Sequence, residues 1–173
     1  MVVQFASEAA VASLFSPHVE KRAKARDSQD RAAVRSSDSA IVMVLTERQV
    51  QAREVLNGAA KHILLEGGSR SGKTRLIVRN IAVRAAKAQH SRHLITRFRF
   101  NHCKESIGLD TLPSVLEEEK IPFSLNKSDW YATLPNRSEI WFGGLDDKER
   151  TEKILGKEFC TIYLNECSQI PWA

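Results

Sequence analysis

A glycine-rich stretch in the middle of the chain has the residue types and spacing that bind phosphate. Residues 67–74, GGSRSGKT, fit the pattern of a glycine, four further residues and then Gly-Lys-Thr. Glycines let successive backbone N–H groups turn inward around an anion, and a following helix adds the positive end of its dipole. In such a loop Lys73 contacts the β- and γ-phosphates of a nucleotide, and the Thr74 hydroxyl coordinates Mg²⁺. The residues predicted to surround the phosphates are Gly67, Gly68, Ser69, Arg70, Ser71 and Gly72.

Phosphate transfer from a metal-bound nucleotide also needs an acidic group near the metal. Asn165-Glu166 follows the apolar run 159–164 and is the candidate pair for that position. Glu166 would act as the general base that activates a water molecule. Asn165 stands where an aspartate is usual, and its amide oxygen would hold Mg²⁺ through water. The alternative is that Glu166 is an ordinary exposed carboxylate at the end of a strand.

Two polar residues near the loop are candidates for nucleotide contacts. Gln49 lies upstream of the loop, where a glutamine can form paired hydrogen bonds with the adenine edge, although a surface glutamine is the alternative. Arg70 could neutralise charge that develops in the transition state, or could instead pair with a carboxylate.

The apolar pattern around these residues predicts alternating helices and strands. We expect helices over 46–58, 74–88, 101–119 with an interruption at Pro113, and 146–155, and strands over 62–66, 93–96, 123–125, 130–134, 139–142 and 159–164. Short apolar strands alternating with helices are typical of an α/β protein with a buried sheet. The sequence therefore predicts an α/β fold of the P-loop NTPase class (ASCE type), a three-layer sandwich with a mainly parallel sheet.

Composition limits the protein class and the domain division. Of the 173 residues, 42% are hydrophobic and 27% are charged, as in globular proteins. Residues 1–45 lack a clear periodicity, so we expect an appendage there that is partly helical or disordered, and a partial ATPase domain over 46–173. The apolar stretch 2–15 contains Glu8 and is shorter than the ~20 residues of a membrane-spanning helix, so we expect no membrane contact. Three cysteines without a CxxC pair indicate reduced thiols inside a cell.

Charge is concentrated in the middle of the chain. Residues 46–100 carry twelve Lys or Arg against three Asp or Glu, a net charge of +9, whereas the whole chain carries +5. Such a block indicates contact with phosphate or nucleic acid, or simply a solvated helix face. His90, His93, His102 and Cys103 lack the further ligand that would complete a tetrahedral zinc site, so we expect no zinc there.

Four segments together resemble the large terminase subunit of tailed bacteriophages, with the resemblance extending from Leu45 to Trp172. They are LTERQ at 45–49, EGGSRSGKT at 66–74, IWFGGLDD at 140–147 and IYLNECS at 162–168. The resemblance implies an ATPase that drives double-stranded DNA into a capsid from the bacterial host cytoplasm. Its implied partners are a portal protein, a small terminase subunit and further copies of itself on the portal.

The resemblance also carries roles onto individual residues. It implies phosphate and Mg²⁺ contacts for Lys73 and Thr74, catalysis by Glu166 and adenine recognition by Gln49. In many family members the loop arginine stands one place earlier, where this chain has Ser69. The implied role of neutralising charge in the transition state is therefore assigned to Arg70, one residue later. Arg97 and Arg99 occupy the region of a basic motif linked to DNA or to coupling.

The family continues beyond the Glu166 strand with further strands and a nuclease domain, whereas only seven residues follow Glu166 here. We therefore expect a sheet that is incomplete at its C-terminal side, impaired ATP turnover and no nuclease activity. A strand without its neighbour would expose unpaired backbone. The alternatives are a non-catalytic remnant that binds nucleic acid and another P-loop DNA motor such as a helicase.

Overall fold

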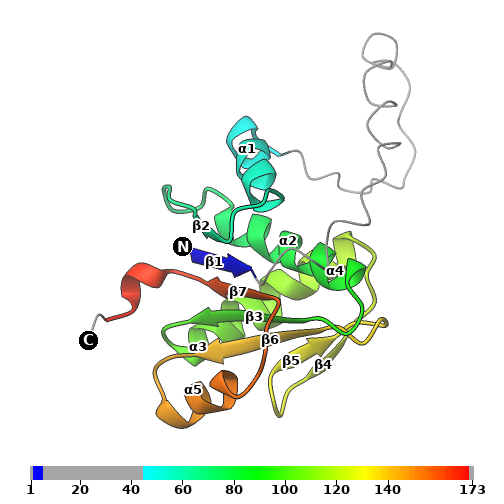
Figure 1. Cartoon of the computed structure of the whole chain (residues 1–173), viewed down its shortest axis with the longest axis vertical. Helices are drawn as coiled ribbons and strands as arrows, with labels where there is room; N and C mark the ends of the chain where they lie inside the picture. Colours follow the sequence, from blue (N-terminus) through cyan, green and yellow to red (C-terminus); the bar gives the residue numbers. More distant parts are fainter. Residues whose placement is uncertain (1, 6–44, 172–173) are drawn as a thin grey trace.

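The computed structural model describes residues 2–5 and 45–171, which form one mixed seven-stranded sheet with helices packed against it (Figure 1). The strands are β1 (Val2–Phe5), β2 (His62–Leu64), β3 (Arg92–Arg97), β4 (Ser124–Asn126), β5 (Tyr131–Thr133), β6 (Glu139–Gly144) and β7 (Thr161–Leu164). Their order across the sheet is β2-β1-β7-β3-β6-β5-β4. The central strand β3 runs parallel to β6 and to β7, while β1, β4 and β5 pair antiparallel with their neighbours.

The helical segments lie close to their predicted positions. They are α1 (Glu47–Leu56), α2 (Lys73–Lys87), α3 (Phe100–Cys103), the π-helix η3 (Lys104–Thr111), α4 (Leu112–Glu118), α5 (Lys148–Leu155) and the 3₁₀-helix η4 (Cys167–Gln169). Among the described residues, no helix is long and apolar enough to cross a membrane. The predicted α/β fold of the P-loop NTPase class is confirmed.

Two adjacent glycines at the end of β6 show how helices cover both faces of the sheet. A Cβ on Gly143 would lie 2.5 Å from Cδ1 of Ile154 in α5, and one on Gly144 would lie 2.5 Å from Cβ of Phe100 in α3. Successive residues of a strand point to opposite faces, so α5 and α3 approach the sheet from opposite sides. A side chain at position 144 would push α3 away from the strand, because it would also lie 2.7 Å from the backbone N and Cα of Phe100, whereas one at position 143 would displace the end of the Ile154 side chain.

Residues 101–119 stay helical through Pro113, so the predicted interruption there is wrong. The change occurs earlier, where η3 widens the helix and the Leu112 N–H bonds back five residues to the Ile107 carbonyl. Pro113 then falls in the first turn of α4, where the fixed φ of its ring fits a helix.

The strand that precedes Glu166, β7, has a neighbour on each side, which corrects the expectation of an unpaired edge. On one side β7 pairs with β3, and on the other it pairs with β1. The segment Val2–Phe5 therefore belongs to the sheet, although we expected residues 1–45 to lie outside the domain. Residues 6–44 lie outside the described part of the chain, and the boundary near residue 45 stays a prediction.

A buried polar cluster closes the C-terminal end of α2. The hydroxyls of Ser91 and Ser138 both donate to the Ala88 carbonyl, at 2.7 and 2.6 Å, and Asn136 donates to the Ala85 carbonyl at 2.7 Å. His93 is 1% exposed and lies 3.0 Å from the Ser91 hydroxyl through Nε2. Burial, together with the nearby charge of Arg84, lowers the pKa of His93 to about 4. The carbonyl groups at the C-terminal end of α2 therefore accept hydrogen bonds from uncharged side chains.

Candidate active site

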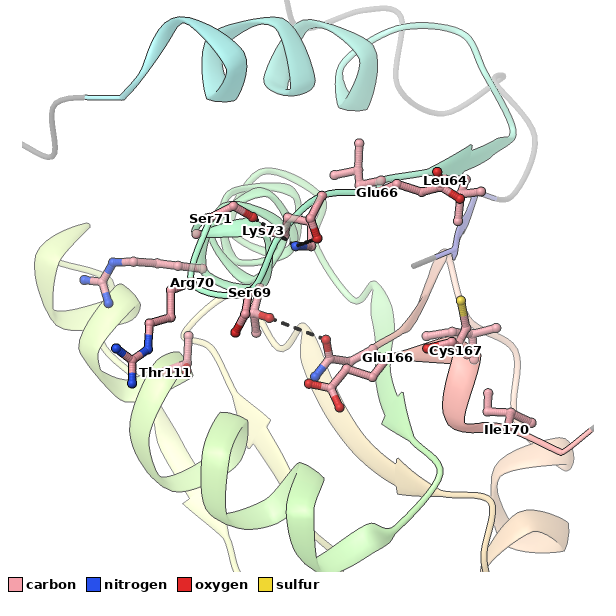
Figure 2. Close-up of a pocket in the computed structure, with 18 of the residues that line it drawn as sticks. Leu64, Glu66, Ser69, Arg70, Ser71, Lys73, Thr111, Glu166, Cys167 and Ile170 are labelled. Atoms are coloured by element: carbon pink, nitrogen blue, oxygen red, sulfur yellow. Dashed lines mark hydrogen bonds between the residues drawn. The ribbon is translucent and has the colours of Figure 1, made fainter.

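The glycine-rich loop connects β2 to α2 and forms one wall of a cavity of about 1180 Å³ (Figure 2). The opposite wall comes from the segment that follows β7, Asn165 to Ser168. Gly67 and Gly72 have φ values of 152° and 78°, which side chains rarely adopt. These two glycines let the loop turn back toward the first residue of α2, so the helix N-terminus faces the cavity.

Lys73 is held inside the loop by three oxygen atoms. Its Nζ donates to the Gly67 and Gly68 carbonyls at 2.7 Å each and to the Ser71 hydroxyl at 2.9 Å. As the first residue of α2, it carries its charge over the helix N-terminus, where an anion would also be attracted. Lys73 therefore lies inside the loop that the sequence predicts to bind phosphate, and its phosphate contact stays a prediction.

The structure brings Thr74 together with Asn165, the two residues for which the sequence predicts Mg²⁺ contacts. The Thr74 hydroxyl donates to the Asn165 amide oxygen at 3.4 Å, and the Tyr163 hydroxyl donates to the same oxygen at 2.7 Å. Asn165 is 4% exposed and Tyr163 is fully buried, so this amide is fixed in orientation. Burial raises the pKa of Tyr163, which keeps its hydroxyl a neutral donor.

Tyr163 is a site residue that the sequence analysis missed. The apolar pattern places it in the predicted strand 159–164 and assigns it no further role. The alternation of the strand offers a signal that could have found it, because residues 163 and 165 lie two apart and point to the same face.

Glu166 is held beside the cavity by an ion pair with Arg97. The Arg97 guanidinium contacts the Glu166 carboxylate, with side-chain exposures of 16% for the arginine and 45% for the glutamate. Glu166 has a φ of 52°, in the left-handed region that glutamate rarely adopts. This backbone conformation ends β7 and directs the chain into η4, with Glu166 at its N-cap.

Gln49 connects α1 to the phosphate loop. Its Oε1 accepts from the Thr46 N–H at 3.0 Å, and its Nε2 donates to the Ser71 carbonyl at 3.1 Å. The Thr46 hydroxyl in turn accepts from the Gln49 N–H at 3.3 Å, which completes a capping box. A side-chain amide has two donor hydrogens and two acceptor lone pairs, so one of each stays available for a ligand.

The arginines of the candidate site point in different directions. Arg70 lines the cavity and is exposed, with a φ of 60°, and Figure 2 shows its side chain extending away from Glu166. Arg97 is engaged with Glu166, and Arg99 is exposed just before α3. The loop arginine and Glu166, the carboxylate for which the sequence predicts a catalytic role, are therefore not brought together in this structure. Within residues 2–5 and 45–171, no three His, Cys, Asp or Glu side chains form a group that could hold a metal ion.

A family model described as the phage terminase large subunit matches residues 59–172 of this chain. The match includes the phosphate loop, both walls of the cavity and the Arg97–Glu166 pair. This chain belongs to the phage terminase large subunit family.

A solved structure supports the same fold for this terminase chain. The large terminase from a thermophilic bacteriophage is similar, with a TM-score of 0.63 and 13% sequence identity. The similar region covers 74% of this chain and 34% of the thermophilic phage protein, so the chain spans about a third of the length of that terminase. A search of curated proteins gave no match.

Proposed function

We propose that the chain binds Mg²⁺ and ATP in the cavity between the phosphate loop and Glu166, as the ATPase part of a DNA-packaging motor. The observation that carries the proposal is the meeting of Lys73, Thr74 and Asn165 with Glu166 around one cavity of about 1180 Å³. That volume exceeds the ~300–1,000 Å³ of typical ligand pockets and can hold a nucleoside triphosphate.

The residues present fit a Mg²⁺-bound nucleotide. Loop N–H groups and Lys73 supply positive charge for phosphate, and the Thr74 and Asn165 oxygens are the hard ligands that Mg²⁺ prefers. Asn165 has no charge, so it would hold Mg²⁺ through a water molecule. The bound metal would neutralise phosphate charge during transfer.

Each remaining site residue has a proposed task. Glu166 accepts the proton of an attacking water molecule. Gln49 uses its spare donor and acceptor on the adenine edge while it stays bonded to Ser71. Arg70 lines the cavity, but it has to turn toward Glu166 before it can stabilise the transition state, because its side chain extends away from Glu166 (Figure 2).

Family membership supports the wider role of the motor. We propose that double-stranded DNA is the translocated substrate, and that a portal protein, a small subunit and further copies of this chain are the partners in the host cytoplasm. The charge of +9 over residues 46–100 provides candidate contacts for DNA phosphates.

The experiment that tests the proposal measures Mg²⁺-dependent ATP hydrolysis by the 173-residue chain, with and without double-stranded DNA. Replacing Glu166 with glutamine should leave ATP affinity within about threefold and lower turnover by roughly 10²–10⁴-fold, the usual contribution of a general base. Glu158→Gln is the matched control, because Glu158 is exposed and does not line the cavity. Equal turnover by the Glu166 variant and the wild type would refute the catalytic assignment. Salt-sensitive DNA binding without any nucleotide binding would favour the non-catalytic alternative.

A further inference from the structure

The strand that leads into the phosphate loop reaches the rest of the sheet through one partner. Within the described residues, β2 is the outermost strand on its side, and its neighbour is β1. Strand β1 in turn pairs with β7, the strand that leads to Asn165 and Glu166. The backbone hydrogen bonds that connect β2 to β7 therefore run through Val2–Phe5, in addition to the side-chain bond from Thr74 to Asn165.

The register places the start of β1 beside the ends of β2 and β7, the two strands that lead into the walls of the cavity. Val2 is opposite Leu64 on one side and opposite Leu164 on the other. Leu64 lies three residues before Gly67, and Leu164 lies two residues before Glu166. In Figure 1 the β1 arrow runs opposite to those of β7 and β3, so β1 begins at the edge of the sheet where they end.

Distances in a sheet make an intervening strand necessary. Neighbouring strands lie about 4.8 Å apart, so β2 and β7 are separated by roughly 10 Å, too far for direct backbone hydrogen bonds. Both strands are antiparallel to β1 and hence parallel to each other. Without β1, the backbone groups on the facing edges of both strands would lose their partners.

The filling strand comes from outside the segment that the family model matches. The match covers residues 59–172, which include β2 and β7 but not β1. The gap between two family strands is thus occupied by a segment that lies far away in the sequence and beyond the matched region.

We propose that the gap between β2 and β7 is a strand-accepting slot, that residues 2–5 of the same chain are its occupant, and that this occupant holds the phosphate loop and Glu166 at their working separation. The slot takes an extended, antiparallel segment through backbone hydrogen bonds. The predicted effect on nucleotide binding rests on the proposed function. The slot and its occupant rest only on the pairing of β1 with β2 and β7.

Amide hydrogen exchange on the 173-residue chain tests the slot without any ligand. Val3→Pro removes a backbone N–H from the middle of β1 and weakens its pairing. We expect the amides of β2 to exchange at least tenfold faster in this variant, while those of β6, which pairs with β3 and β5, keep their wild-type rates. Ala12→Pro, outside β1, is the matched control. Unchanged exchange in β2, or equal acceleration in β2 and β6, would overturn the proposal.

A synthetic peptide separates occupation of the slot from a general loss of stability. Adding residues 1–8 as a free peptide to the Val3→Pro chain should restore protection of the β2 amides in a concentration-dependent way. The same peptide with Val3→Pro should have no effect. Failure of the wild-type peptide to restore protection at any concentration would contradict a slot that accepts strands.

Nucleotide affinity then connects the slot to the site. Mg²⁺-ATP should bind the Val3→Pro chain at least tenfold more weakly than the wild type, and the wild-type peptide should recover the affinity. If the wild-type chain itself binds no nucleotide, the proposed function is wrong. The hydrogen-exchange results still show whether residues 2–5 occupy the gap between β2 and β7. If nucleotide binds equally well to both chains, the positioning role of β1 is wrong.

Discussion

Arg97 and Glu166 form an ion pair between the ends of two parallel neighbouring strands. Thr96 of β3 is opposite Leu164 of β7, and the Asn165 N–H donates to the Thr96 carbonyl at 2.8 Å. This register brings the residue after Thr96 beside the residue that follows Asn165. The Nε of Arg97 is buried and has no hydrogen-bond partner in the described structure, and the guanidinium contacts Glu166 through Nη2.

Replacing Arg97 with alanine should lower ATP turnover by about tenfold or more and leave ATP affinity within threefold. The reason is that a half-exposed Glu166 without its partner samples several rotamers, and misplacement of a catalytic group is costly. Steady-state hydrolysis and equilibrium ATP binding measure the two quantities separately. Arg97→Lys keeps the charge and should retain part of the turnover, and turnover equal to wild type in Arg97→Ala would show that the pair does not position Glu166.

Replacing Asn165 with aspartate should increase the affinity for Mg²⁺ in the presence of ATP by several-fold. The substitution adds a negative charge next to the Thr74 hydroxyl, in a position that is 4% exposed. Without Mg²⁺ the same buried charge lacks a cation and should lower the melting temperature. Titration of Mg²⁺ at saturating ATP and thermal unfolding with and without the metal measure both effects. An affinity for Mg²⁺ equal to that of the wild type would show that Asn165 does not contribute to the metal site.

Replacing Gln49 with alanine should weaken ATP binding more than GTP binding, because an adenine contact is lost along with the bond to Ser71. Loss of the capping box should also cost about 1 kcal/mol of stability. Competition between the two nucleotides and chemical denaturation measure these effects. Gln51→Ala is the matched control, since Gln51 is exposed on the same helix. Equal losses for ATP and GTP would leave Gln49 with a structural role alone.

The stability of the protein should fall as the pH decreases from about 6.5 to about 4 because of His93. Its pKa is about 4 in the folded protein against about 6.5 in the unfolded chain, so in this range the unfolded state binds more protons. The contribution is about 1.4 kcal/mol for each pH unit between the two values. Denaturation at a series of pH values compares wild type with His93→Gln, which cannot titrate. Identical pH profiles of the two proteins would show that His93 is not responsible.

The sequence was sufficient where function depends on a local pattern. The loop that contains Lys73 and Thr74, the strand before Glu166 and the helix predicted over 46–58 follow from spacing over a few residues. Such patterns reflect hydrogen bonds within one turn or the alternation of one strand, and these are visible in a single sequence.

Relationships between distant segments could not be derived in this way. The Arg97–Glu166 pair depends on the register of β3 against β7, and the bond from Tyr163 to Asn165 depends on burial of that strand. The place of Val2–Phe5 in the sheet depends on a gap that exists only after β2 and β7 have been assembled. A four-residue strand has too little periodicity to be recognised, and the choice of its partners is a tertiary property.

Equilibrium binding of Mg²⁺-ATP to the 173-residue chain and to its Lys73→Ala variant tests the central assignment most directly. Lys73 is held by three oxygens of the phosphate loop, and Lys148→Ala is the matched control because the Lys148 side chain is 92% exposed on α5. We expect saturable, Mg²⁺-dependent binding to wild type and to Lys148→Ala, with at least a hundredfold weaker binding to Lys73→Ala. Equal affinities of the wild type and Lys73→Ala, or no retention of ATP by the wild type, would contradict it.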